Sequence, residues 1–133
     1  GLYRLEREQL LETLRVMDAR GIDVVDLPGT PVRLLARVVR RLPAALSRPL
    51  LGRAVGAGRG AKMPSFHIDL HAGRERSEVD FLNGAVVRAG QDVSVPTPGN
   101  TLLTRTLLAM TCGEVSLETY RGRPARLLTE LSR

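Results

Sequence analysis

Residues 62–100, KMPSFHIDLHAGRERSEVDFLNGAVVRAGQDVSVPTPGN, decide the fold of this chain. Ser65 and Ser77 each stand where a helix would start, so we expect one helix over residues 65–72 and another over residues 77–90. Polar side chains are unusually dense on this otherwise apolar helical pattern: Ser65, Asp69, Glu78, Asp80 and Asn83. Burying such groups costs free energy unless they are hydrogen-bonded, so the stretch predicts a functional surface as well as helices.

The rest of the chain predicts more helices around this stretch and no strands. Leu10, Leu14 and Met17 recur at helical spacing before Gly21. Thr30 is the expected N-cap of a second helix, whose expected apolar stripe is Val32, Leu35, Val39 and Leu42. The expected helices are 3–20, 31–42, 47–55, 65–72, 77–90, 101–112 and 124–131. Between them we expect an extended crossing at 21–29, a flexible glycine-rich loop at 52–60 and a turn at 96–100. The sequence therefore predicts an all-α helical bundle, with the strongly apolar segment 101–112 as its central helix.

Composition favours a small helical domain of the soluble globular type. The chain has 133 residues, of which 43% are hydrophobic, 26% charged and only 3% aromatic, so its core must be built from Leu, Val and Ala. Cys112 is the one cysteine, which excludes a disulfide within the chain and fits a reducing compartment. No apolar run approaches the roughly 20 residues that a membrane helix needs, and the first residues do not form a signal peptide. We therefore expect a cytoplasmic protein.

The charge is strongly positive, at +6, and the basic residues are concentrated before the decisive stretch. Residues 27–68 hold no acid and eight basic residues: Arg33, Arg37, Arg40, Arg41, Arg48, Arg53, Arg59 and Lys62. Such a block is compatible with nucleic acid or with the phosphates of a dinucleotide. No aromatic residue lies among the arginines to stack on bases, and no nucleic-acid-binding motif accompanies them. The pattern favours a solvated helix face.

Three further patterns resemble sites but lack the residues that would complete one. His67 and His71 have the spacing of two metal ligands on a helix, but no motif supplies the third ligand that zinc needs. Residues 56–61 satisfy the dinucleotide pattern G-x-G-x-x-G/A without the preceding strand that gives it meaning. Cys112 has no histidine partner and is expected to be a small core residue. The sequence predicts neither a metal site nor hydrolytic chemistry.

The order of motifs from residue 65 to residue 100 resembles one known family. The matching elements are Ser65-Phe-His-Ile-Asp69, Gly73-Arg74, Ser77-Glu78-Val79-Asp80, Asn83-Gly84 and Pro96-Thr-Pro98-Gly-Asn100. They are similar, in order, to the C-terminal domain of the 2-dehydropantoate 2-reductase (ketopantoate reductase) family. That resemblance implies the helical bundle of the C-terminal domains of ketopantoate reductase and 6-phosphogluconate dehydrogenase-like enzymes. It also implies an NADP-dependent oxidoreductase that reduces ketopantoate to pantoate in pantothenate biosynthesis, or acts on a related 2-keto acid.

The resemblance also implies roles for three side chains. Ser65 would hydrogen-bond the keto acid, Asp69 would support the same face, and Glu78 would contact the nicotinamide cofactor. Spacing alone leaves simpler alternatives, in which Ser65 is a helix cap, Asp69 faces solvent and Glu78 complements a helix dipole. Asp80 has no clear role in the family and is expected to be structural. Asn83-Gly84 in mid-helix indicates either a close approach of two helices or room for a ligand.

The resemblance finally implies that residues 1–133 are one part of a larger enzyme. Family members begin with a Rossmann domain that binds NADP, followed by a helix with the catalytic lysine. This chain has neither, and its only lysine, Lys62, lies on the wrong element. We therefore expect a single substrate-side domain with no catalytic residue of its own, inactive alone. Its expected partners are a 2-keto acid, the missing Rossmann domain and a second copy in a homodimer, with no membrane and no nucleic acid. The alternative is a stand-alone interaction module with an arginine-rich, anion-binding face.

Overall fold

The computed structural model of the chain describes residues 2–59 and 77–131, with side chains described for residues 2–53 and 77–131. Within these ranges the chain is helical, and its one β-type pairing is an isolated bridge between Leu27 and Thr30. The prediction of an all-α fold is confirmed. The elements are α1 (Leu2–Ala19), α2 (Val32–Arg41), α3 (Ala44–Arg59), α5 (Glu78–Asp92), α6 (Pro98–Thr111), the short 3-10 helix η1 (Leu117–Thr119) and α7 (Pro124–Leu131).

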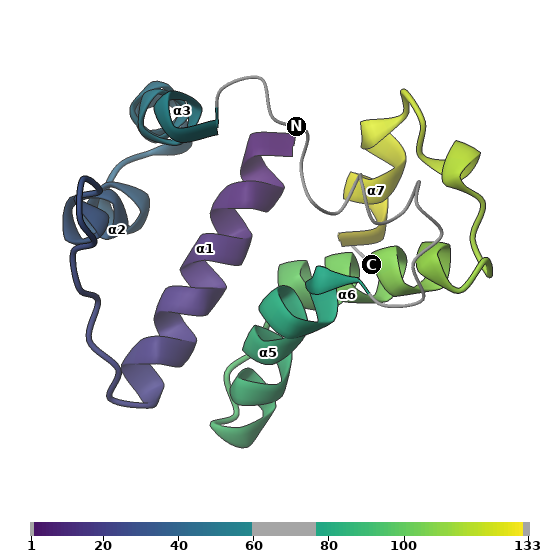
Figure 1. Cartoon of the computed structure of the whole chain (residues 1–133), viewed down its shortest axis with the longest axis horizontal. Helices are drawn as coiled ribbons and strands as arrows, with labels where there is room; N and C mark the ends of the chain where they lie inside the picture. Colours follow the sequence, from purple (N-terminus) through teal and green to yellow (C-terminus); the bar gives the residue numbers. More distant parts are fainter. Residues whose placement is uncertain (1, 60–76, 132–133) are drawn as a thin grey trace.

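The central helix of the bundle is α1. It runs between the pair α2 and α3 on one side and the group α5, α6 and α7 on the other (Figure 1), and it packs against each of these five helices. The expectation that the segment 101–112 would be central is therefore wrong. Helix α1 takes this place because it buries two faces, whereas a single apolar stripe was expected. Leu10, a member of that expected stripe, is 44% exposed.

The first half of the bundle joins α1 to α2 and α3 through a small apolar core. Leu14 of α1, Val39 of α2 and Leu51 of α3 form this core. The apolar stripe expected on α2 is confirmed by the burial of Val39. Arg7 of α1 ties the end of α2 to the core, because its Nη2 donates to the carbonyl oxygens of Val39 (2.8 Å) and Leu42 (3.2 Å). A cation at this position also complements the negative end of the helix dipole.

Two details of this half differ from the sequence prediction. The expected N-cap, Thr30, makes no side-chain cap; Asp26 instead accepts a hydrogen bond from the backbone N–H of Arg33 at 2.8 Å. The bridge between Leu27 and Thr30 folds the chain back so that Asp26 reaches the start of α2. Helix α3 begins at Ala44 and continues through Arg59, so the expected loop at 52–60 is wrong up to residue 59. Alanines and arginines stand between the glycines of residues 52–59 and favour a helix, which offsets part of the cost of about 1 kcal/mol for each glycine.

The second half of the bundle joins α1 to α5 and α6. Ser77 caps α5 as predicted, because its Oγ accepts from the backbone N–H of Val79 at 3.3 Å. Residues 96–100 were expected to form a turn, but Pro98 already opens α6. Proline is favoured in a first helical turn, where its missing N–H costs nothing. The connection from α5 to α6 is tight, since a Cβ on Gly90 would lie 2.7 Å from the backbone oxygen of Val95.

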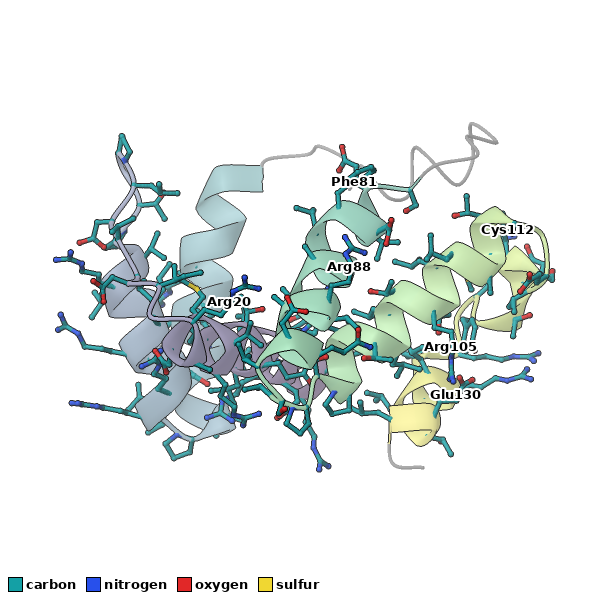
Figure 2. The ribbon with its side chains drawn as sticks, turned by 90° about the horizontal axis from the view of Figure 1, so that it is seen from below. Arg20, Phe81, Arg88, Arg105, Cys112 and Glu130 are labelled. Atoms are coloured by element: carbon teal, nitrogen blue, oxygen red, sulfur yellow. The ribbon has the colours of Figure 1, made fainter. Side chains whose placement is uncertain are left out.

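The last segment folds back onto α6. Helix α7 spans Pro124–Leu131, as the sequence predicts. The hydroxyl of Tyr120 donates to Glu130 Oε1 at 2.6 Å. The other oxygen of Glu130 lies 3.7 Å from the Arg105 guanidinium of α6, and Figure 2 shows these two side chains beside each other. Glu130 therefore links the end of the chain to the second half of the bundle.

Candidate functional site

The described residues line an open cavity of about 980 Å³ between the two halves of the bundle. Helix α1 lies along one side of it, α3 forms a second wall, and α5 with the start of α6 forms a third. Side chains from all four helices line it, among them Leu10, Thr13, Arg48, Leu82, Asn83 and Asn100. A large, mostly apolar cavity with a few polar groups is the usual form of a small-molecule site.

The polar part of this wall is a chain of hydrogen bonds that crosses from α5 through α6 to α1. Asn83 Nδ2 donates to Asn100 Oδ1 at 2.8 Å. Asn100 Nδ2 in turn donates to Glu12 Oε2 at 2.6 Å and to the backbone oxygen of Gln9 at 3.2 Å. Asn100 is buried and Asn83 is half-buried. The two amides therefore connect the cavity wall to the interior of the bundle.

Glu12 is the anchor of this chain of hydrogen bonds and is fully buried. Its Oε1 accepts from the backbone N–H of Gly99 at 2.6 Å, and its Oε2 accepts from the backbone N–H of Asn100 at 2.9 Å. With the Asn100 side chain, three donors satisfy one carboxylate at the positive end of α6. A Cβ on Gly99 would lie 3.1 Å from Glu12 Oε1, which explains why glycine suits this position.

Sequence reasoning missed Glu12, although the chain carried a signal. Glu12 lies seven residues after Leu5 and four before Val16, so it shares a helix face with two buried apolar residues. An acid in that place cannot remain unpaired, because burying a charge without hydrogen bonds is very costly. The pattern therefore indicated a buried partner, but it did not indicate that the partner would be the start of α6.

Two of the three expected site residues, Ser65 and Asp69, lie outside the described residues, as do Lys62, His67 and His71. Glu78 is described and lies in the first turn of α5 with an exposed side chain. Leu82, which lines the cavity, follows Glu78 by one helical turn. Glu78 itself is not a lining residue of the cavity and lies one turn nearer the start of α5.

Gly84, which follows Asn83, was expected to mark either a close approach of two helices or room for a ligand. Its nearest neighbours are instead side chains of its own helix. A Cβ on Gly84 would lie 2.7 Å from Asp80 Oδ1 and 3.1 Å from Arg88 Nη1. These two side chains of α5 form an ion pair at 2.8 Å, which passes over the glycine. Gly84 thus leaves room for the side chains of its own helix, and Asp80 takes part in an ion pair within that helix.

Several other expectations can be compared with the described residues. In residues 2–59 and 77–131, no group of three or more His, Cys, Asp or Glu side chains is placed to hold a metal ion. The residues before Gly60 form a helix where a dinucleotide fingerprint would need a strand. Cys112 is exposed at the end of α6, so its expected place in the core is wrong. The arginines of α2 and those at 48 and 53 are exposed, as a solvated face requires.

None of the described helices is long and apolar enough to cross a membrane. The described residues thus form an all-α domain with a large cavity and a buried polar anchor beside it. The family model described as ketopantoate reductase PanE/ApbA C terminal matches residues 1–111, and the chain belongs to this family. In full-length members this domain follows an N-terminal domain. Comparison with curated proteins and with solved structures gave no match.

Proposed function

We propose that this chain is the substrate-side domain of an NADP-dependent 2-keto acid reductase of the ketopantoate reductase type. The observation that carries the proposal is the family match over residues 1–111. In this proposal the enzyme is cytoplasmic and reduces ketopantoate to pantoate, a step of pantothenate biosynthesis. A Rossmann domain outside residues 1–133 binds the cofactor and the helix that follows it supplies the acid lysine, so residues 1–133 alone carry out no reduction.

The proposed binding residues are Ser65 and Asp69 for the keto acid and Glu78 for the cofactor. A keto acid with a hydroxyl offers both acceptors and a donor, and the serine hydroxyl can pair with either. The exposed carboxylate of Glu78 is suited to accept hydrogen bonds from the hydroxyls of the nicotinamide ribose. Glu78 precedes the lining residue Leu82 by one helical turn, which supports this role, since the two ligands must meet for hydride transfer.

The charge of the cavity wall also supports a keto acid. Arg48 lines the cavity, and its exposed guanidinium offers paired donors that suit a carboxylate. Glu6 is an acid that lines the same cavity from α1. A substrate with a carboxylate at one end and a hydroxyl at the other matches such a wall better than a purely apolar molecule.

Two substitutions in the full-length protein encoded with this chain test the assignment. We expect Ser65→Ala to raise the KM for the keto acid by about two- to ten-fold, the loss of one neutral hydrogen bond. We expect Glu78→Ala to raise the KM for NADPH instead. Glu118→Ala is the matched control, because Glu118 is an exposed acid that also follows a capping serine, Ser116. If neither substitution changed a constant relative to the control, the assignment of these residues would be wrong.

The proposal includes a homodimer formed through the helices around residues 77–112. Phe81 of α5 supports an interface there, because 65% of this large apolar side chain is exposed, and Figure 2 shows it at the start of α5. Exposed aromatic residues are enriched at protein interfaces. Light scattering of the full-length protein measures the state directly, and a monomer throughout the micromolar range would contradict the dimer.

A further inference from the structure

We propose that Asn83 binds the hydroxyl group of the substrate, and that Glu12, acting through Asn100, is the residue that positions it. The inference rests on the proposed function and adds to it a specificity determinant in the described part of the cavity. It starts from three facts given above: the burial of Glu12, the direction of the hydrogen bonds, and the place of Asn83 in the cavity wall.

The direction of the hydrogen bonds follows from the charge of Glu12. An ionised carboxylate only accepts hydrogen bonds, so the side chain of Asn100 must turn its Nδ2 toward Glu12. Both N–H bonds of that Nδ2 are then used, by Glu12 Oε2 and by the backbone oxygen of Gln9. Asn100 Oδ1 is left to face α5, where it accepts from Asn83 Nδ2. The buried charge thus sets which end of each amide points where.

This orientation determines what Asn83 offers to a ligand. The hydrogen bonds among the described residues use one N–H of its Nδ2 and leave its Oδ1 and its second N–H. Asn83 is half-buried and lines the cavity, so these two groups lie at the wall. An acceptor and a donor side by side suit a hydroxyl, which donates to the oxygen and accepts from the N–H. An anionic carboxylate would meet the amide oxygen unfavourably.

The alternative is that Asn83 only ties α5 to α6. The two roles differ in one measurable respect. A tie between helices affects every substrate equally, whereas a hydroxyl-binding residue affects only substrates that carry the hydroxyl. Ketopantoate and 3,3-dimethyl-2-oxobutanoate make the needed pair, because they differ only in that hydroxyl. The ratio of their kcat/KM values therefore reports on the contact and cancels a general loss of folded enzyme.

The experiment compares this ratio in the full-length protein and its variants. We expect Asn83→Ala to lower the preference for ketopantoate by about two- to ten-fold, as one lost hydrogen bond implies. Asn100→Ala keeps both backbone N–H contacts to Glu12 but removes the three side-chain hydrogen bonds of Asn100, to Asn83, Glu12 and the Gln9 carbonyl. It removes the contact that orients Asn83, so it should lower the preference in the same direction. The double variant should lose no more than Asn83→Ala alone, since both act on one contact. Asp80→Asn is the control, because Asp80 lies on the same helix and pairs with Arg88.

Each outcome decides between the claims. A lower preference in Asn83→Ala, with the control unchanged, supports the inference. An unchanged preference in an active Asn83→Ala enzyme overturns the inference and leaves the proposed function standing. A preference that falls in Asn83→Ala but not in Asn100→Ala overturns the positioning role of Glu12 and Asn100. A wild-type protein that neither reduces nor binds the two keto acids overturns the proposed function, and the inference with it.

Discussion

Both halves of the bundle pack on α1 through buried apolar side chains, but the second half is also held by the buried charge of Glu12. Toward α2 and α3, α1 buries Leu14 against Val39 and Leu51. Toward α6, it buries the carboxylate of Glu12 against the first N–H groups of the helix. Hydrophobic contacts depend on buried area and have no direction, whereas the hydrogen bonds of a buried charge require fixed geometry. We therefore expect the position of α6 on α1 to be more strictly fixed than the positions of α2 and α3, because its hydrogen bonds are buried and made to a charge.

This difference also indicates why the polar wall of the cavity belongs to the second half. Asn83 and Asn100 receive their orientation from a buried anion, and such a network is precise only when every member is satisfied. The wall from the first half is contributed by Arg48 and its neighbours on α3, where the described side chains near the cavity are largely exposed. A ligand would therefore find a rigid polar surface on one side and an adjustable surface on the other.

The largest effect on stability is expected from removing the charge of Glu12. We expect Glu12→Gln to lower the free energy of unfolding by about 3 kcal/mol, because the amide places a donor against a buried N–H and weakens charge-assisted hydrogen bonds. Glu6→Gln is the control on the same helix, where the acid is exposed and little change is expected. Denaturant unfolding of the full-length protein measures both. A cost below about 0.5 kcal/mol, the size of an ordinary surface change, would show that Glu12 is no anchor.

A smaller effect is expected from the apolar side of α1. Leu14→Ala should cost about 2–3 kcal/mol, at the lower end for a buried leucine, because the small core around it can partly close the space. Leu10→Ala, at the 44% exposed position, should cost much less. The same unfolding measurement compares the two. Equal costs would mean that the apolar core is not where the structure places it.

The smallest effect is expected at the end of the chain and depends on pH. Tyr120 donates to Glu130, which raises the pKa of the tyrosine above its ordinary value of 10.0. Because the folded-state pKa is raised, this contribution is fully present below pH 10 and is lost as the pH rises past the folded-state pKa. We expect Tyr120→Phe to cost about 1 kcal/mol at neutral pH. Unfolding curves between pH 7 and about pH 10.5 should show the gap between variant and wild type closing. A gap that does not change with pH would contradict this role.

Local signals predicted the elements of this fold better than their arrangement. The cap at Ser77, the stripe through Val39 and the bounds of α7 each depend on neighbours in the sequence, and each was predicted correctly. The central place of α1 depends on which helix faces pack together across the bundle. The spacing of apolar residues along one helix does not encode this. The cap of α2 by Asp26 was missed for a related reason, since a chain reversal brings it there.

The residues of the candidate site also differ in whether local sequence signals could predict them. Glu78 and Asn83 were singled out because polar residues on an apolar helix have a local signature. The roles of Glu12 and Asn100 come from residues 88 positions apart in the chain, and no spacing rule joins them. The polar residues of the decisive stretch were therefore found from sequence, whereas the group that orients Asn83 required the structure.

The measurement that tests the account most directly is the oxidation of NADPH by the full-length protein encoded with this chain, followed with a series of 2-keto acids. We expect NADPH consumption to depend on the keto acid and to be fastest with ketopantoate. We expect slower NADPH consumption with 3,3-dimethyl-2-oxobutanoate, because the contact of the hydroxyl with Asn83 is lost. Folded protein that binds NADPH but oxidises it with none of these acids, or that prefers the analogue without the hydroxyl, would contradict the account.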